Sequence, residues 1–501
     1  GLYGFYYFKE DLMKMYDIII IGAGIIGGSI ARELSRYDLD VAVLEAREDV
    51  ATATTGTNSA IVHAGYDRSP DTHMARLNVQ GNRLYDQIKS ELNIPFKRVG
   101  SLVLAFDESD QHMLEILLRQ GKESGIEGLK IIPQEEVLDR EPNVNPQVLS
   151  ALWAPTGGIT CPYELTVGYV ENAVDNGVKI FLNHPVIEIS RDGDGSFIIV
   201  TPKGEFRASY IVNCAGVNSD EIPRMLGVEE FSIKPRRGEY LLYDRKYGDT
   251  VNSVIFQTPS EISKGVLITQ TVDGNLLVGP NAEDLEGKGD ISTTDSGLDY
   301  IYNAGKKSIP TLTRRGVIRT FAGLRAIADT GDFIIGPSKK IEGLFHAAGI
   351  SSPGLSAAPA IAKEMVAILD RHIGPLTEKG DFNPYRSPIP RFRDLNRREQ
   401  QELIDSDPRY GRVICRCETV TEGEIVEALR RSVPVTTIDG IKRRTRAGMG
   451  RCQGGFCTPR IMDIMSRELD IPIESISKSR ETSNIVIGKI REDHGEVRER
   501  Q

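Results

Sequence analysis

Four of the six cysteines of this 501-residue chain fall within 43 residues near its C-terminal end. Cys415 and Cys417 form a C-x-C pair, and Cys452 and Cys457 form a C-x4-C pair. Grouped thiols of this kind hold a metal ion, an iron–sulfur cluster or a disulfide, and a cytosolic compartment disfavours the disulfide. Four thiolates suit a tetrahedral zinc ion and are also the usual ligands of an iron–sulfur cluster. The spacing therefore predicts a metal centre.

A second pattern with chemical meaning stands near the start of the chain. Gly22, Gly24 and Gly27 form G-x-G-x-x-G directly after the apolar run 18–21. In the later stretch DVAVLEA (40–46), the apolar residues 41–44 are followed directly by Glu45. Glycines allow a tight turn and a close approach to a pyrophosphate at a helix N-terminus, while the acid accepts hydrogen bonds from ribose hydroxyls. The pattern predicts a nucleotide-binding strand–helix–strand unit, with a glycine-rich turn that binds no ligand as the alternative.

Length and charge limit the classes of function. The chain is long enough for two or three domains, and its formal net charge of −10 argues against general binding to nucleic acid or anionic membranes. An anionic substrate therefore has to be captured by locally placed arginines. The longest uncharged apolar run, 18–31, is shorter than the roughly 20 residues of a membrane span and is broken by glycines. No signal peptide is evident, residues 1–14 are left out of the fold prediction, and a cytoplasmic protein is expected.

Two later segments indicate how the nucleotide domain is completed. Residues 208–220 form a strand that runs into a small-residue turn, and residues 343–369 form a strand, a Gly/Ser/Pro loop and an Ala-rich helix. Together with the glycine motif they resemble the two-domain flavoproteins of the D-amino-acid-oxidase superfamily. The resemblance implies FAD as the cofactor. It also implies that the last helix points its N-terminus at the flavin pyrimidine, where a positive helix end stabilises negative charge.

Three motifs narrow the resemblance: ATTGTNSAIVHAGYD (53–67), KPRRGEYLLYD (234–244) and FAGLRAIADTGDFIIGP (321–337). They are similar to the branch of L-2-hydroxyglutarate dehydrogenase and FAD-linked glycerol-3-phosphate dehydrogenase, over about residues 16 to 375. The implied fold class is α/β (α+β overall), with a Rossmann-like FAD domain of glutathione-reductase type, a mixed-sheet substrate domain and a small helical [2Fe–2S] domain. The expected boundaries are 16–77, 151–219 and 326–375 for the FAD domain, 78–150 and 220–325 for the substrate domain, 385–408 for a linker, 409–466 for the [2Fe–2S] domain and 467–501 for a tail.

The same resemblance implies which residues contact the FAD. They belong to the glycine motif, to the acid that follows it, and to the loops that end the later strands. The expected residues are Gly22, Gly24, Gly27, Glu45, Ala46, Arg47, Thr55, Asn58, Ser59, Val186, Ala215, Gly216, Gly349, Gly354 and Leu355.

A flavin that oxidises an alcohol needs a general base for the hydroxyl proton while the C–H hydride passes to the flavin N5, and a cation for any acidic group of the substrate. His63 is the expected base, with a packing or flavin-supporting role as the alternative. Arg325 matches the anion-binding arginine of the branch, and a guanidinium suits a carboxylate or phosphate bidentately. Arg237, with Arg236, is a second candidate for the substrate, although an arginine at the start of a strand is often structural. His346 is expected under the cofactor.

The segment between the cysteine pairs resembles the small helical [2Fe–2S] domain of bacterioferritin-associated ferredoxin, which is appended to anaerobic glycerol-3-phosphate dehydrogenases and other flavoprotein dehydrogenases. The resemblance implies that the four cysteines hold a [2Fe–2S] cluster, with zinc or a relic without a cluster as alternatives. Cys161 and Cys214 are expected to be buried packing residues. The basic run 442–446 is expected to be a solvated face or a docking surface for an electron-transfer partner.

Two signals favour different substrates. Asp67 stands where glycerol-3-phosphate dehydrogenases of the branch tend to carry an arginine, which favours a 2-hydroxyacid, whereas the appended cluster domain favours glycerol 3-phosphate. The expected function is oxidation of sn-glycerol 3-phosphate to dihydroxyacetone phosphate. Electrons then pass through the cluster to a second redox subunit, a flavoprotein or ferredoxin-like chain, in a hetero-oligomer. The alternatives are a 2-hydroxyacid or amino-acid dehydrogenase and a non-catalytic electron-relay subunit.

Overall fold

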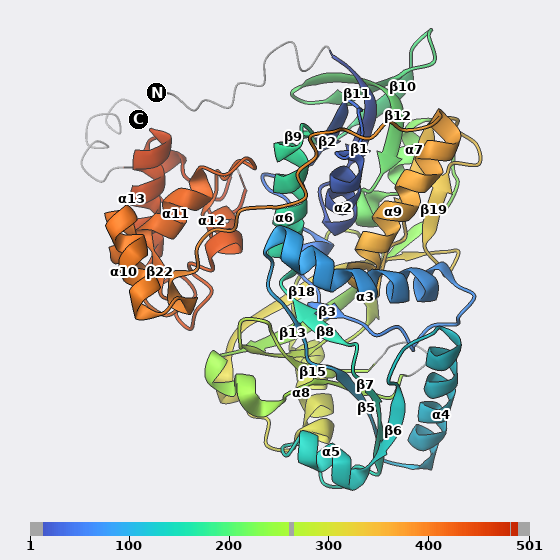
Figure 1. The fold of residues 1–501 in the computed structure, drawn as a ribbon, viewed down its shortest axis with the longest axis vertical. Helices are drawn as coiled ribbons and strands as arrows, with labels where there is room; N and C mark the ends of the chain where they lie inside the picture. Colours follow the sequence, from blue (N-terminus) through green and yellow to red (C-terminus); the bar gives the residue numbers. More distant parts are fainter. Residues whose placement is uncertain (1–13, 260–264, 481, 489–501) are drawn as a thin grey trace, which may run out of the picture. The chain divides into compact units, whose positions relative to one another are not determined.

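The structure, a computed structural model, describes residues 14–259, 265–480 and 482–488. The chain divides into two compact units (Figure 1). Unit 2 contains Val50–Pro388 and the described residues before Arg47, and unit 1 contains Arg47–Asp49 and the described residues from Ile389 on. The division falls inside the segment expected as a linker, and helix α10 (Arg397–Ser406) occupies the later part of that segment.

The first sheet of unit 2 carries the nucleotide motif. Its order is β10-β11-β12-β1-β2-β9, with β20 beside β12 and β19 beside β20. The strands are β1 (Met15–Ile21), β2 (Val41–Leu44), β9 (Lys179–Phe181), β10 (Glu188–Arg191), β11 (Phe197–Thr201), β12 (Gly204–Asn213), β19 (Ile334–Pro337) and β20 (Leu344–Ala348). Strands β9, β2, β1, β12 and β20 run parallel. Ile18, Ile19 and Ile20 are fully buried because β1 lies between β12 and β2, as expected for a parallel sheet.

A second, mixed sheet forms the other half of unit 2. Its order is β17-β13-β16-β15-β14-β5-β7-β6, with β18 beside β13, and a small third sheet has the order β3-β8-β4. The strands of the second sheet are β5 (Ser101–Ala105), β6 (Lys130–Pro133), β7 (Ser150–Ala154), β13 (Ile233–Tyr243), β14 (Val254–Gln257), β15 (Leu267–Gln270), β16 (Leu276–Gly279), β17 (Glu283–Asp284) and β18 (Val317–Ala328). Those of the third are β3 (Ile61–Val62), β4 (Phe96–Arg98) and β8 (Gly158–Thr160). The mixed sheet agrees with the expected fold class.

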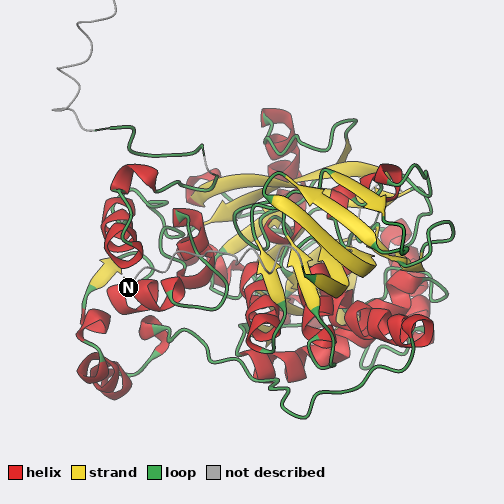
Figure 2. Cartoon of the chain, turned by 90° about the horizontal axis from the view of Figure 1, so that it is seen from above, coloured by secondary structure: helices red, strands yellow, loops and turns green. Residues whose placement is uncertain are grey.

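Helices pack around these sheets (Figure 2). In unit 2 they are α2 (Ile25–Leu34), α3 (His73–Leu92), α4 (Glu108–Glu123), α5 (Gln134–Arg140), α6 (Pro162–Asp175), α7 (Glu221–Met225), α8 (Asp295–Ser308) and α9 (Gly354–Ile373). Helix α2 packs against α6 and α9, and α9 packs against α3. Among the described residues, no helix combines the length and apolar character that a membrane span requires.

The two cysteines outside the C-terminal group are packing residues, as expected. Cys161 is 3% exposed and Cys214 is 7% exposed. Burial raises the pKa of Cys214, which keeps that thiol neutral and unreactive.

The glycine loop between β1 and α2 is shaped by close backbone contacts. Gly22 has a φ of +105°, in the region that favours glycine. A Cβ on Gly27 would lie 1.9 Å from the carbonyl oxygen of Gly22, so only a hydrogen fits between the loop and the first turns of the helix. This contact seats α2 directly against the end of β1.

Unit 1 folds around a core of its own. The strand pair β21 (Val413–Cys415) and β22 (Val420–Thr421) is antiparallel. The helices are α10, α11 (Glu422–Leu429), α12 (Ile438–Thr445) and α13 (Thr458–Leu469). A capping box starts α11, because the Thr421 N–H donates to the Glu424 carboxylate at 2.7 Å while the Thr421 hydroxyl accepts from the Glu424 N–H. Cys415 and Cys457 belong to this core.

The basic run Lys442–Arg446 differs from the expectation. Arg444 and Arg446 are only 6% and 7% exposed. Arg446 donates from Nε to Glu418 Oε2 at 2.9 Å, and Arg444 donates from Nη1 to Asp49, which belongs to the same unit, at 2.9 Å. Buried guanidinium groups need such carboxylates, because an unpaired buried charge is costly. The prediction that this run forms a solvated face or a docking surface is therefore wrong.

The Gly27 contact gives a prediction about stability. Gly27→Ala should lower the free energy of unfolding by about 1–3 kcal/mol, because the added methyl group meets backbone that cannot move aside. Thermal unfolding followed by circular dichroism would measure it. The control is Gly193→Ala, since a Cβ at Gly193 has nothing within 4 Å among the described residues. Equal melting temperatures for the two variants would contradict this account of the loop.

Candidate active site and cluster site

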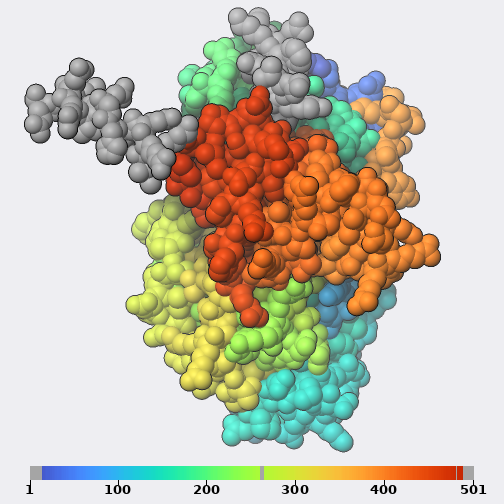
Figure 3. Space-filling model, turned by 90° about the vertical axis from the view of Figure 1, so that its left-hand side faces the viewer, coloured from blue at the N-terminus to red at the C-terminus, as the bar shows by residue number. Residues whose placement is uncertain are grey.

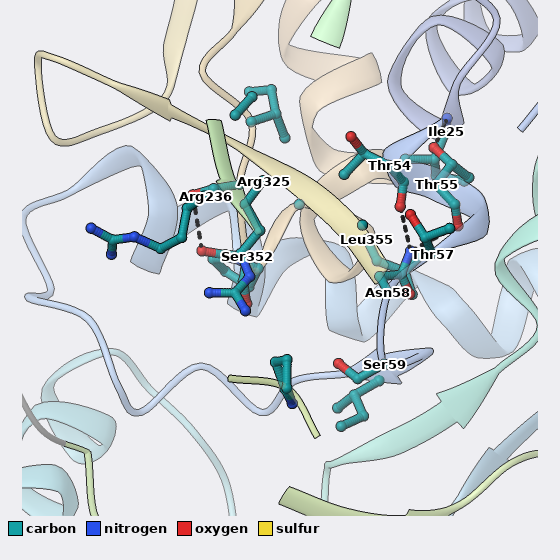
Figure 4. Close-up of a pocket in the computed structure, with 18 of the residues that line it drawn as sticks. Ile25, Thr54, Thr55, Thr57, Asn58, Ser59, Arg236, Arg325, Ser352 and Leu355 are labelled. Carbon is teal, nitrogen blue, oxygen red and sulfur yellow. Dashed lines mark hydrogen bonds between the residues drawn. The ribbon is translucent and has the colours of Figure 1, made fainter. Parts of the chain in front are cut away.

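A cavity of about 390 Å³ in unit 2 brings together most of the residues with expected roles. It is lined from the N-termini of α2 and α9, from the loop around the 3₁₀ turn Thr54–Gly56, and from strands β13 and β18. Figure 4 shows Arg236 and Arg325 at one part of this pocket and Ile25, Thr54 and Thr55 at another.

The first turn of α2 forms the nucleotide part of the pocket. In the described part of the chain, no side-chain cap closes this helix at Gly24. The Ile25 N–H donates to Thr55 Oγ1 at 3.0 Å. The Ala23 N–H donates to Glu45 Oε2 at 2.8 Å, so the acid lies beside the loop. A Cβ on Gly24 would meet only Thr55 Oγ1, at 3.2 Å, so this glycine leaves open space in front of the helix.

The residues expected to contact FAD divide into two sets. Gly24, Thr55, Asn58, Ser59, Gly216, Gly354 and Leu355 line the cavity. Gly22, Gly27, Glu45, Ala46, Val186, Ala215 and Gly349 are in unit 2 but are not on the cavity wall. Gly22 and Gly27 shape the loop through close backbone contacts, and Arg47 is grouped with unit 1.

Helix α9 presents its N-terminus to the same cavity. Its first residues, Gly354 and Leu355, line the wall together with Ser352. Within the described residues, its N-cap Pro353 makes no side-chain cap bond. The positive end of a 20-residue helix therefore faces the pocket, where it favours negative charge on whatever binds there.

Arg325 lies on β18 and lines the pocket. Its Nη2 donates to the main-chain oxygen of Asn281 at 2.7 Å, and it also hydrogen-bonds the hydroxyl of Tyr240. Burial is the main influence on Arg325 and lowers its pKa, but a guanidinium remains charged in a protein. No carboxylate of the described residues lies within ion-pair distance of it, so its charge is available to an anion.

Arg236 and Arg237 project to opposite faces of β13, as neighbours in a strand do. Arg236 pairs across the sheet with Arg325, lines the pocket, and bonds Asp284 at 2.5 Å through its Nε. Arg237 is 3% exposed and bonds Glu283 at 2.6 Å. Arg237 is not among the residues that line the pocket, whereas Arg236 is (Figure 4).

Arg68 and Tyr240 also line the pocket, although sequence reasoning gave them no role. Arg68 donates from Nη2 to the main-chain oxygen of Ser352 at 3.3 Å. Tyr240 is buried, and burial raises its pKa, so its hydroxyl stays a neutral donor. Tyr240 lies four residues after Arg236 and therefore on the same face of the strand. This spacing is the sequence pattern that could have placed Tyr240 at the pocket.

His63 follows β3 and lies on the pocket wall. Its main chain is fixed on both sides, because its N–H donates to Ser356 Oγ at 2.7 Å and its carbonyl accepts from Asn82 Nδ2 at 2.9 Å. Its ring packs against Phe256 with the centroids 5.6 Å apart. The arrangement holds one imidazole at the pocket surface.

His346 has a different environment. It is 1% exposed in β20 and is not on the pocket wall. Its Nδ1 lies 3.1 Å from Asn213 Nδ2, and its Nε2 lies 3.2 Å from Glu230 Oε2. Burial is the main cause that lowers its pKa, so the ring favours the neutral form. His346 is therefore a buried framework residue of β20.

The four C-terminal cysteines line a separate cavity of about 270 Å³ in unit 1. They form two pairs. Cys415 and Cys457 are each 1% exposed and hydrogen-bond each other. Cys417 and Cys452 are half-buried, with their sulfurs 3.4 Å apart. All four are free thiols, so one wall offers four sulfur ligands.

The backbone around these sulfurs suits thiolate ligands. The hydrogen bond from Cys457 lowers the pKa of Cys415, and the backbone N–H groups of Gly448 and Glu418 lower it further against the opposing effect of burial. A Cβ on Gly450 would lie 2.4 Å from Cys417 Cβ, so glycine is required beside this cysteine. The residues present therefore fit an iron–sulfur cluster. The open space at Gly24 and the two uncapped helix N-termini likewise fit a dinucleotide in unit 2.

Comparison with known proteins gives the family of each part. A family model described as FAD dependent oxidoreductase matches residues 17–368. A model described as BFD-like [2Fe-2S] binding domain matches residues 413–467. Both expected cofactors, FAD and a [2Fe–2S] cluster, are thereby confirmed, and zinc is set aside.

Individual relatives agree with these matches. A glycerol 3-phosphate dehydrogenase of Caloramator mitchellensis is 48% identical over 474 residues, which cover 95% of this chain and 98% of the relative. Human mitochondrial L-2-hydroxyglutarate dehydrogenase is 30% identical, over 62% of this chain and 78% of that protein. The solved FAD-bound L-α-glycerophosphate oxidase of Mycoplasma pneumoniae is 31% identical, with a TM-score of 0.71 over 75% of this chain and 99% of that chain. This chain therefore belongs to the FAD-dependent oxidoreductase family and is an enzyme that carries an additional [2Fe–2S] binding domain.

Proposed function

We propose that this enzyme oxidises sn-glycerol 3-phosphate to dihydroxyacetone phosphate and that the electrons leave through the [2Fe–2S] domain to a separate redox protein. The observation that carries the substrate assignment is the guanidinium of Arg325, which faces the pocket without a carboxylate partner in the described chain. Arg236 and Arg68 line the same pocket, so a dianionic phosphate meets several cations.

The relatives support this assignment. The Caloramator mitchellensis glycerol 3-phosphate dehydrogenase matches nearly the whole chain, including the segment with the four cysteines. Glycerol 3-phosphate oxidase of Mycoplasma genitalium is 33% identical and matches 74% of this chain. Both relatives are named for glycerol 3-phosphate. The match to unit 2 and the match to unit 1 therefore favour the same substrate.

The chain's own residues divide the chemical work. Arg325 holds the substrate phosphate and thereby fixes the carbon skeleton in the pocket. His63, on the same wall, accepts the proton of the hydroxyl group that is oxidised. The bound FAD supplies the two-electron acceptor. The N-terminus of α9 favours the negative charge that accompanies this oxidation.

The alternative substrate is L-2-hydroxyglutarate or another 2-hydroxyacid. Its carboxylates would also suit the arginines, and Asp67, which stands where the resemblance predicts an arginine for a glycerol-3-phosphate enzyme, lines the pocket. Anaerobic mixing of the purified enzyme with each compound separates the alternatives, because only a true substrate bleaches the flavin absorption rapidly. Rapid bleaching by L-2-hydroxyglutarate and none by glycerol 3-phosphate would overturn the proposal. Bleaching by neither compound would favour another 2-hydroxyacid as the substrate or a relay subunit.

The nucleotide loop gives a prediction about cofactor content. Gly24→Val should fold, because its Cβ meets only a threonine hydroxyl, but should purify without flavin, because the side chain fills the space in front of the helix. The ratio of flavin to protein absorption measures the effect. Gly193→Val, in open surroundings, serves as the control. A Gly24→Val protein with full flavin content would show that the pyrophosphate does not approach this glycine.

The arginines give a prediction about kinetics. Arg325→Ala should reduce kcat/KM for glycerol 3-phosphate by about 30- to 1000-fold, or roughly 2–4 kcal/mol, with FAD retained. Arg325→Lys should recover only part of this loss, since an ammonium makes no two-point contact. Arg314→Ala is the control, because Arg314 is 53% exposed and paired with Asp299. Unchanged kinetics for Arg325→Ala would exclude Arg325 from the substrate site.

The cysteines give a prediction about the electron route. Cys452→Ser should abolish the visible absorption of the cluster, while substrate should still bleach the flavin because that chemistry belongs to unit 2. Turnover with a protein electron acceptor should fall steeply, whereas turnover with a small dye that oxidises the flavin should persist. Stopped-flow absorption resolves the two steps. Protein-linked turnover that survives the loss of the cluster would make the domain a structural appendage.

A further inference from the structure

The cysteine cavity of unit 1 is bordered by an exposed aromatic ring and two arginines. Arg416, Phe456 and Arg460 all line the cavity and are exposed; together they are called the cluster patch. Phe456 is 83% exposed, which is unusual for a phenylalanine in a folded unit. Figure 3 shows the surface of unit 1 in orange and red. An exposed aromatic side chain at the edge of a redox site indicates a contact surface.

The two arginines of the cluster patch have no carboxylate partner among the described residues. Other exposed arginines of the unit do: Arg412 lies 3.3 Å from Glu422, and Arg467 lies 2.7 Å from the same carboxylate. Within the described parts of the chain, no acidic side chain lines this cavity. Two arginines without carboxylate partners in the described chain therefore stand at the cysteine cavity of a protein whose net charge is −10.

The patch adjoins the accessible side of the cysteine set. Arg416 stands between Cys415 and Cys417 in the chain, and Phe456 stands directly before Cys457. Cys417 and Cys452 are half-buried, whereas Cys415 and Cys457 are fully buried. A protein that docks on the patch would therefore come nearest to the Cys417–Cys452 side. Short distance is what one-electron transfer between proteins requires of such a contact.

We propose that the cluster patch is the docking surface for an acidic one-electron carrier protein. Phe456 supplies the apolar centre of the contact, and Arg416 and Arg460 attract and orient carboxylates around it. Aromatic residues and arginine are enriched in interface centres, and complementary charge raises association rates. The inference rests on the proposed exit of electrons through the cluster. One substrate molecule loses two electrons and two protons, so two carriers each gain one electron per turnover.

Two carrier proteins of opposite charge test the proposal: cytochrome b5, which is acidic, and cytochrome c, which is basic. The reversal variant is Arg416→Glu/Arg460→Glu. The control with an equal change in charge is Arg397→Glu/Arg398→Glu in the first turn of α10, where the Arg398 side chain is 87% exposed. Cluster and flavin absorption are recorded for every preparation, and carrier-reduction rates are divided by the dye turnover of the same preparation.

We expect the parent protein to bind cytochrome b5 in titration calorimetry at low ionic strength, and salt to weaken this binding. The reversal variant should bind it at least about 10-fold more weakly and reduce cytochrome c faster than the parent does. The control variant should behave like the parent. Phe456→Ala, which keeps both charges, should weaken the binding without changing its salt dependence.

Equal cytochrome b5 binding by the parent and reversal variants, or an equal loss in the control variant, would overturn the docking surface. Calorimetry needs no substrate, so it tests the patch even if glycerol 3-phosphate fails to bleach the flavin. That failure would contradict the proposed function alone. Normal flavin bleaching with unchanged cytochrome b5 binding in the reversal variant would contradict the patch alone.

Discussion

The contact between Gly27 and Gly22 is the constraint on which the nucleotide site of unit 2 depends. A Cβ on Gly27 would lie 1.9 Å from the carbonyl oxygen of Gly22. The strand, loop and helix can therefore pack together only if residue 27 carries no side chain. The closure brings the first turn of α2 to the end of a fully buried strand. The N-terminus of α9 reaches the same cavity from a segment more than 300 residues later in the chain. Two positive helix ends on one pocket are what a bound dinucleotide and a reaction that develops negative charge both require.

Charge is distributed unevenly across the pairing of β13 and β18. Arg236 and Arg325 stand opposite each other, an arrangement of like charges that would by itself weaken the sheet. Asp284 compensates Arg236 at 2.5 Å, while Arg325 is held by the main-chain oxygen of Asn281. A carbonyl positions a guanidinium without neutralising it. The sheet thus keeps one cation fixed in place and still able to attract a substrate anion.

Much of the fold and the two cofactor sites could be predicted from the sequence, because the informative patterns are short and local. The glycine motif, the four cysteines and Arg325 each stand in a short pattern with its own chemical meaning. Residues whose role depends on which way a side chain points were harder. Arg237 and Arg236 are one position apart, and only the register of β13 decides which of them faces the pocket. The basic run 442–446 was misread because the carboxylates that draw it inward are distant in sequence.

The unequal burial of the two cysteine pairs bears on how long the cluster survives. Cys415 and Cys457 are sealed in the core of unit 1, but Cys417 and Cys452 are half-buried and so within reach of dissolved oxidants. Accessible thiolate sulfur is where oxidation of cysteine begins. The opening that leaves these two sulfurs accessible also admits oxygen and peroxide. Oxidative damage to the cluster ligands should therefore start at the outer pair, Cys417 and Cys452.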